Sequence, residues 1–306
     1  MNILFWNFRC GKPADVSEAL AALARLAAIR EVDLLVLADT AVGKPRKPLD
    51  PGRVLEALNA AGNHFEKTED PSFPDHPGAQ LYTQFPSDTL APFRADGRLD
   101  VRRYRWKDRE EILLAVIHFF DRRNYDPQDQ DNLAAVVNTT LDDAEIEAGH
   151  TRTVVFGDFN MNPYDRGMTN FSGFGAMMTR ELAVRHTDSK ARPGHGPKRF
   201  YNPAWTRLGR ALPCPPGTHY WGNVSKPSNV FWHLLDQVLV RPGLFPTFQD
   251  DTFQIITSMP GIDGEEIPLI ANTGMHWKLR YSDHLPILFR LDLTKLGPMT
   301  RGGDYA

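Results

Sequence analysis

The sequence has little cysteine, and it lacks any long apolar run. Cys10 and Cys214 are its only cysteines. They are too few for a disulfide scaffold or a cysteine-based metal site, so free thiols in a reducing compartment are expected. No stretch reaches the roughly 18 apolar residues that a membrane span needs. The first residues carry neither a basic region before their apolar run nor a small-residue cleavage site after it. We therefore expect a cytoplasmic protein without a membrane span.

The chain also lacks a strong net charge. The formal charge of −3 gives no overall basic field, so any nucleic-acid binding must rely on local patches. Hydrophobic residues make up 42% of the 306 residues, enough to bury a core in one large α/β domain or in two ordinary ones. Because no linker, repeat or shift of composition divides the chain, we expect one domain over residues 1–293 and a tail over 294–306.

Strand-like and helix-like segments alternate along the chain. Apolar runs predict strands over 3–8, 33–38, 79–83, 99–106, 112–119, 234–240 and 285–291, and another that includes Val154-Val155-Phe156. Helical spacing of apolar residues predicts helices over 15–30, 51–61, 128–148 and 175–185. This pattern favours a layered α/β domain with sheets inside and helices outside.

Polar residues stand at the ends of several predicted strands. Asp158 and Asn160, in Gly157-Asp158-Phe159-Asn160, lie two residues apart and would face a common side of an extended chain. In Ser282-Asp283-His284, a carboxylate and an imidazole directly precede another predicted strand. The other polar residues in or at the ends of predicted strands are Asn7, Asp39, His118 and Asp236.

This set of side chains favours phosphate-ester hydrolysis. Carboxylate and amide oxygens, without a cysteine or His-x-x-x-His pattern, suit Mg²⁺ or Mn²⁺ better than zinc. A metal can neutralise phosphoryl oxygens while a carboxylate activates water and an imidazolium stabilises the developing charge. Taken alone, Asp39 also fits a turn residue, His118 a core histidine, and Asn7 a tie between the first strand and a loop.

The motifs resemble, in their order, those of the endonuclease/exonuclease/phosphatase superfamily, which includes deoxyribonuclease I, apurinic/apyrimidinic endonucleases, inositol polyphosphate 5-phosphatases and neutral sphingomyelinases. The resemblance spans residues 2–292 and implies a four-layer α/β/β/α sandwich, with two mainly antiparallel or mixed sheets packed face to face and helices outside. Asn202-Pro203-Ala204-Trp205 and Gly217-Thr218-His219-Tyr220-Trp221 also resemble motifs of bacterial members without an assigned substrate. The superfamily-wide matches are Trp6-Asn7, Val36-Leu37-Ala38-Asp39-Thr40, Ile117-His118, Gly157-Asp158-Phe159-Asn160, Leu235-Asp236-Gln237-Val238 and Ser282-Asp283-His284-Leu285-Pro286.

The resemblance implies a role for each of these residues. Mg²⁺ or Mn²⁺ would be held by Asp39, with help from Asn7 and Asp283. Asp39 stands where the family has Glu, so its carboxylate would reach the metal after a small backbone shift or through water, with an altered metal preference.

The same resemblance places the water and the phosphate between the remaining residues. Asp158, with Asn160 beside it, would orient and deprotonate the attacking water. Asp236 would hold His284 as a charged imidazole against the phosphate, and His118 would contact a phosphate oxygen or assist the leaving group. Which histidine is the general acid is left open.

Basic loops follow two of these strands. Lys44 and Arg46 come after Asp39, and Arg122 and Arg123 come after His118, so they are the expected substrate-binding residues for a polyanion. For any one of these clusters taken alone, a solvated charged loop is the simpler interpretation.

Three functions fit these features. The first is a monomeric nuclease that hydrolyses DNA or RNA phosphodiesters. The second is a phosphatase or phosphodiesterase acting on a small molecule or a lipid headgroup, and the third is a non-catalytic binding module on the same fold. A long, open, basic groove would favour the nuclease, and a closed pocket would favour the small-molecule enzyme.

Overall fold

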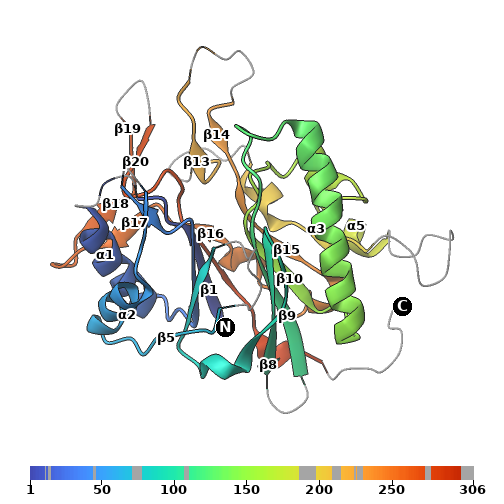
Figure 1. Ribbon diagram of the computed structural model, residues 1–306, viewed down its shortest axis with the longest axis horizontal. Coiled ribbons are helices and arrows are strands. Elements are labelled where there is room, and N and C mark those ends of the chain that lie inside the picture. Colours follow the sequence, from blue (N-terminus) through green and yellow to red (C-terminus); the bar gives the residue numbers. More distant parts are fainter. Residues whose placement is uncertain are drawn as a thin grey trace.

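Two mixed β-sheets form the centre of the molecule (Figure 1). The computed structural model describes residues 1–10, 12, 15–43, 46–70, 78–106, 110–185, 198–208, 215–223, 225, 230–272 and 277–297. The first sheet has the order β16 (Gln254–Ile255), β21 (Ile287–Arg290), β1 (Asn2–Asn7), β2 (Leu34–Ala38), β6 (Gln80–Thr83) and β5 (Glu66–Lys67). The second has the order β11 (Ala176–Met177), β12 (Phe200–Tyr201), β15 (Asp236–Val240), β10 (Thr153–Asp158), β9 (Glu110–His118), β8 (Leu99–Trp106) and β7 (Leu90–Asp96).

Each sheet has a parallel pair of strands at its centre, and a helix connects the two strands of each pair. In the first sheet, α1 (Val16–Ile29) joins β1 to its parallel neighbour β2. In the second, α3 (Pro127–Ala148) joins β9 to its parallel neighbour β10. An antiparallel strand flanks each pair on both sides. The carboxyl ends of both pairs therefore have the same local topology, with two parallel strands between two antiparallel ones.

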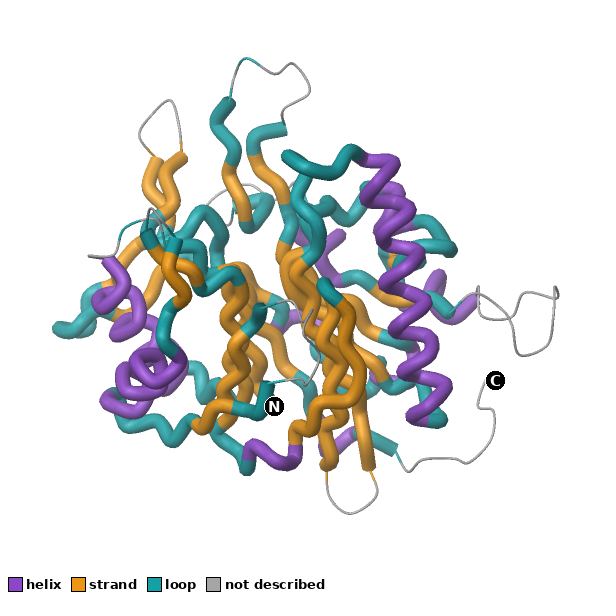
Figure 2. The backbone as a smooth tube through the Cα atoms, in the orientation of Figure 1, coloured by secondary structure: helices purple, strands orange, loops and turns teal. Residues whose placement is uncertain are grey.

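The alternation of side chains along the strands builds the layers. One buried cluster, which includes Phe5 of β1 and Phe156 of β10, fills the space between the two sheets. The outward-facing Leu4 and Trp6 pack against α1 and α2 (Pro51–Ala60). On the opposite side, Val155 belongs to the cluster that α3 covers. Figure 2 shows the strands between these two groups of helices, and the predicted α/β class with mixed sheets is confirmed.

The remaining elements are short. Within the described ranges, the two further helices are α4 (Arg166–Thr169) and α5 (Arg180–Arg185), and five 3-10 turns cover Ser87–Thr89, Pro203–Arg207, Pro242–Leu244, Asp250–Thr252 and Leu293–Lys295. Four small hairpins are β3 (Ala41–Val42) with β4 (Lys47–Pro48), β13 (His219–Tyr220) with β14 (Trp232–His233), β17 (Ser258–Pro260) with β18 (Glu266–Pro268), and β19 (Ile270–Asn272) with β20 (Trp277–Leu279). The hairpins β13–β14 and β19–β20 project at the top of the view in Figure 1.

The structure differs from the expected elements at three places. The helix expected over 175–185 is only α5, because Gly175 turns with φ +57° and the two residues of β11 pair with β12 instead. Strand β7 was not predicted, and a register shift next to Pro92 accommodates the proline at this sheet edge. Leu293 and Leu296 are buried in the inter-sheet core, so packing continues past residue 293, whereas residues from 298 onward lie outside the described part.

None of the helices in the described ranges is long and apolar enough to cross a membrane.

Gly157 is required by the close approach of β9 to β10. A Cβ atom at this position would lie 2.0 Å from the carbonyl oxygen of Ile117, and φ is +139°. We expect Gly157→Ala to destabilise the fold by about 3 kcal/mol, because it adds both a steric clash and backbone strain. Urea denaturation measures the change. Gly243→Ala is the matched control, since its nearest contacts would be ordinary ones at 3.7 Å, and equal losses in both variants would contradict the steric argument.

Candidate active site

The predicted polar residues gather where the central strands of both sheets end. Asn7 ends β1, Asp39 follows β2, and His118 and Asp158 are register partners at the ends of β9 and β10. A cavity of about 210 Å³ opens between these ends. The predicted residues that line it are Asn7, Asp39, His118, Asp158, Asn160 and His284. The geometry therefore brings residues from distant parts of the chain to one site.

Asp236 and His284 form a buried pair next to this cavity. The Nδ1 atom of His284 lies 2.8 Å from an Oδ2 atom of Asp236, and its Nε2 atom lies 4.0 Å from Asp158. Burial acts to lower the pKa of His284, but the charges of Asp236 and Asp158 outweigh it and raise the pKa to about 10. The imidazole is therefore a cation at neutral pH. Its Nδ1–H donates to Asp236, which leaves Nε2–H to face a substrate.

Asp158 accepts three hydrogen bonds. The Nδ2 atom of Asn7 donates to it at 2.8 Å, and Asn160 donates from its backbone N–H at 2.8 Å and from its Nδ2 atom at 3.2 Å. Complete burial raises the pKa of Asp158, although His284 opposes the rise. A carboxylate with a raised pKa is better suited to accept a proton near neutral pH.

Side chains of the sequence motifs hold the backbone of this site in place. The indole N–H of Trp6 donates to the carbonyl oxygen of His284 at 2.9 Å. The hydroxyl of Ser282 donates to the carbonyl oxygen of Asn7 at 2.6 Å. The hydroxyl oxygen of Thr218 accepts from the backbone N–H of Asp236 at 3.1 Å. The first two bonds tie β1 to the segment before β21, and the third ties β15 to the segment before β13.

The residues near Asp39 fit a hard divalent cation, but arginines already pair with the carboxylate. Asp39 shares the cavity with the Oδ1 atom of Asn7, which is buried without a hydrogen-bond partner in the described chain. Such oxygens suit Mg²⁺ or Mn²⁺. An Nη2 atom of Arg46 lies 2.5 Å from one carboxylate oxygen of Asp39, and Arg9 lies 3.8 Å from the other. A metal at Asp39 would therefore require Arg46 to move.

Another group of possible donors is less suited to a metal. Asp158, Asp236 and His284 offer atoms that all lie within 4.8 Å of one another. The Nδ1 atom of His284 already donates to Asp236, however, and a protonated imidazole has no free lone pair for a metal. Water activation and phosphate contact, rather than metal binding, therefore stay the predicted roles of this group.

Asp283 lies apart from Asn7 and Asp39. It lines two neighbouring cavities, and its carboxylate lies 3.7 Å from Arg9, which also lies beside Asp39. Arg9 thus stands between the two carboxylates that were predicted to share a metal. Metal binding by Asp283 stays a prediction.

Two of the four predicted substrate-binding residues line the same cavity. Arg122 and Arg123 line a cavity of about 1020 Å³ that also includes His284 and Asn160. Arg122 is held by an ion pair with Asp165. Arg46 lines the cavity of about 210 Å³ instead, and Lys44 lies outside the described residues.

Two arginines that line the cavity of about 210 Å³, Arg9 and Arg98, were not predicted. Arg9 follows the first strand by two residues, so its place after Asn7 offered a signal. Arg98 comes from the turn between β7 and β8 and stacks over Phe120 at 4.4 Å, which no local sequence pattern indicates.

The imidazole of His219 lies beside that of His284. The two ring centroids lie 4.8 Å apart, and the Nδ1 atom of His219 lies 2.8 Å from the carbonyl oxygen of Asp283. Burial, together with the charge of His284, lowers the pKa of His219 to about 4. His219 is therefore neutral and donates to the loop that carries His284.

Comparison with known proteins gives structural matches alone. No family model matches the sequence, and no curated protein matches it. An endonuclease/exonuclease/phosphatase family protein from Bacteroides thetaiotaomicron is 12% identical with a TM-score of 0.53, over 95% of this chain and 97% of that one.

Two further solved structures show the same likeness. A mannosyl-6-phosphatase from Bacteroides thetaiotaomicron is 12% identical with a TM-score of 0.53, over 95% of this chain and 99% of that one. D. rerio TDP2, complexed with single strand DNA product, is 15% identical with a TM-score of 0.51, over 95% and 98%. The chain therefore has the fold of the endonuclease/exonuclease/phosphatase superfamily.

Proposed function

We propose that the protein is a metal-dependent phosphoesterase, and specifically a nuclease that hydrolyses DNA or RNA phosphodiester bonds. The proposal rests on one observation above all. A cationic His284, held by Asp236, lies 4.0 Å from Asp158 at the edge of a cavity. A base for water and a cation for phosphate thus lie side by side.

The reaction is an in-line displacement by water. Asp158 orients a water molecule and accepts its proton as the new oxygen–phosphorus bond forms. His284 donates from Nε2 to a phosphoryl oxygen and stabilises the added negative charge. The opposite oxygen–phosphorus bond breaks, and His118, which lines the same cavity, gives the leaving oxygen a proton.

Asp39 and Asn7 would hold Mg²⁺ or Mn²⁺. The bound cation would supply Lewis-acid stabilisation of the phosphoryl oxygens. Since Arg46 pairs with Asp39 at 2.5 Å, the guanidinium would release the carboxylate when a metal binds. The freed arginine would then be available to the phosphate.

The shape and charge of the surroundings favour a nucleic acid over a small phosphate ester. The 1020 Å³ cavity beside His284 shares Arg9, Arg123 and Asp283 with a second cavity of about 790 Å³. Together they form an extended basic groove rather than a closed pocket, which suits a nucleic-acid backbone. The similarity to TDP2 with a single strand DNA product agrees with this choice. The similarity to a mannosyl-6-phosphatase keeps a small phosphate ester as the second candidate.

Removal of the base or of the imidazolium should abolish turnover. We expect Asp158→Asn and His284→Gln to slow the hydrolysis of bis-p-nitrophenyl phosphate about 100- to 10,000-fold, because each removes an acid–base or charge-stabilising group. The exposed residues Asp88 and His64 supply the controls Asp88→Asn and His64→Ala, which should keep the wild-type rate. Wild-type protein that shows no metal-dependent hydrolysis of any phosphate ester would support the binding-module alternative instead.

Metal affinity should change in opposite directions in two variants. Asp39→Asn is expected to weaken Mn²⁺ binding about 10-fold or more, since it removes the carboxylate charge. Arg46→Gln is expected to strengthen it, because the competing guanidinium is lost. Free Mn²⁺ measured by electron paramagnetic resonance reports binding independently of activity. If neither variant shifts the titration, Asp39 is not the metal site.

The charge of His284 should depend on Asp236. The pKa of about 10 in the fold exceeds the ordinary 6.5 of an unfolded chain. The stabilisation from this proton is therefore fully present below pH 6.5 and is lost as pH rises through 10. Asp236→Asn should lower the pKa of His284 and shift the alkaline fall in activity to lower pH. Nitrogen-15 NMR titration of the imidazole checks this, and a wild-type value near 6.5 would refute the buried ion pair.

A further inference from the structure

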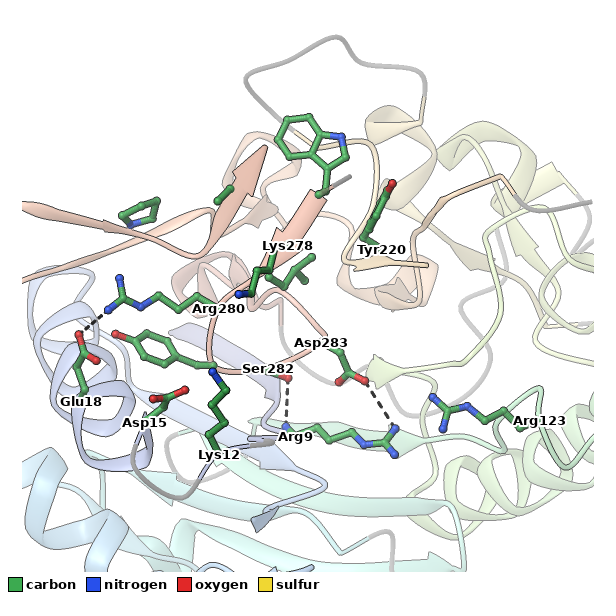
Figure 3. Close-up of a pocket in the computed structure, with 15 residues that line it drawn as sticks. Arg9, Lys12, Asp15, Glu18, Arg123, Tyr220, Lys278, Arg280, Ser282 and Asp283 are labelled. Carbon is green, nitrogen blue, oxygen red and sulfur yellow. Dashed lines mark hydrogen bonds and ion pairs between the residues drawn. The ribbon is translucent and has the colours of Figure 1, made fainter. Parts of the chain in front are cut away.

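The cavity of about 790 Å³ forms one end of the groove, and Asp283 lies where it meets the 1020 Å³ cavity. It is lined by Lys12 from the segment before α1 and by Lys278 from the β19–β20 hairpin. Figure 3 shows the ammonium groups of these two lysines entering the cavity from opposite sides, with Asp283 and Arg9 at the end nearest Arg123. Distant parts of the chain thus place two lysines around one hollow.

The charges around this cavity are unbalanced. Five cationic side chains and three acidic ones line it, although the whole chain has a net charge of −3. Arg280 is paired with Glu18 at 2.8 Å, and Arg9 lies 3.7 Å from Asp283. Lys12 and Lys278 form no side-chain hydrogen bond or ion pair with any described residue. Their charges are therefore available to an anionic ligand.

Aromatic rings stand beside these lysines. Tyr220 and Trp277 line the cavity, and both pack on Trp232, with ring centroids 5.2 Å and 6.0 Å from it. Trp232 thereby joins the β13–β14 and β19–β20 hairpins, and these contacts hold the two rings in place in the lining of the cavity. Aromatic rings next to basic groups are the combination that binds unpaired bases and the phosphates between them.

We propose that this cavity is a second binding subsite for a single-stranded segment of the nucleic-acid substrate. Lys12 and Lys278 bind a backbone phosphate away from the scissile one, and Tyr220 or Trp277 stacks on an adjoining base. The inference rests on the proposed nuclease function for its substrate, and it adds the single-stranded state. Stacking needs a base that is not paired, which a duplex does not offer.

Binding can be measured without turnover in an Asp158→Asn background. Fluorescence anisotropy of a labelled ten-nucleotide DNA or RNA strand gives the affinity at several salt concentrations. Lys12→Gln and Lys278→Gln should each weaken binding and reduce the slope of log affinity against log salt by about 0.7, the value for one lost phosphate contact on a single strand. Trp277→Ala should weaken binding about tenfold with little change of slope, and Trp277→Phe should retain most of the affinity.

Lys295→Gln is the matched control. Lys295 follows the far end of β21, and its side chain is 54% exposed, in a local pair with Asp292. Loss of that surface pair costs little, so binding and slope should equal those of the Asp158→Asn parent. An equal effect of Lys295→Gln would mean that general surface charge, and not the cavity, governs affinity, and would overturn the proposal.

The other outcomes separate this subsite from the catalytic proposal. With Asp158 restored, Lys12→Gln and Lys278→Gln should hydrolyse bis-p-nitrophenyl phosphate at the wild-type rate, since that ester has one phosphate. If wild type lacks this activity while the lysine variants still weaken strand binding, the catalytic function fails and the subsite stands. Equal affinity for a duplex, or tight binding of inositol hexakisphosphate that Trp277→Ala leaves unchanged, would overturn the single-stranded assignment.

Discussion

The buried pair of Asp236 and His284, with Asp158 beside it, is the interaction on which the site depends. Two carboxylates and one imidazolium leave one excess negative charge in a region that water scarcely reaches. Burying such charges costs free energy unless other groups compensate. Burial raises the pKa of Asp158, which reflects the cost of keeping this carboxylate charged. Cationic groups around the cavity offset that cost: Arg9, Arg46 and the metal that Asp39 and Asn7 would hold. Charge balance therefore links the base, the imidazolium and the predicted metal site.

The two sheets place these groups by the same local topology. Each has a central parallel pair, β1 with β2 and β9 with β10, with an antiparallel strand on either side. The ends of the parallel strands supply Asn7, Asp39, Asp158 and His118, and the starts of the antiparallel neighbours lie next to His284 and Asp236. Because the sheets pack face to face through one core, their corresponding edges meet. A site assembled from both edges thus needs only polar motifs at the strand ends, because the face-to-face packing of the sheets brings those ends together.

This arrangement explains what could be predicted from the sequence. Motifs such as Gly157-Asp158-Phe159-Asn160 combine a buried strand with polar residues at its end, and a strand end is a local property. The proline-containing β7 and the short hairpins lack such a signature, because their pairing depends on distant partners. Arg98 reaches the active-site cavity from a turn, and Lys278 reaches the neighbouring 790 Å³ cavity from a hairpin; the positions of both follow from the tertiary fold. Arg46 could be placed near Asp39 from its sequence position, but its direct ion pair with the carboxylate depends on side-chain conformations that a local pattern does not specify.

The aspartate at position 39 is best understood together with its backbone and with Arg46. Asp39 has φ +48°, a left-handed conformation that Asp and Asn adopt at lower cost than longer residues. Asn160, in the other half of the site, has φ +49° and stabilises its turn by bonding to Asp158. At Asp39 the turn is closed by the backbone N–H of Ala41, and Arg46 bonds both the side chain and the carbonyl oxygen of Asp39. A Glu side chain at position 39 would face the same guanidinium, and its backbone would adopt the left-handed conformation at a higher cost. A change of metal preference would therefore involve Asp39 and Arg46 together, since the carboxylate, its backbone and the competing cation would all have to change.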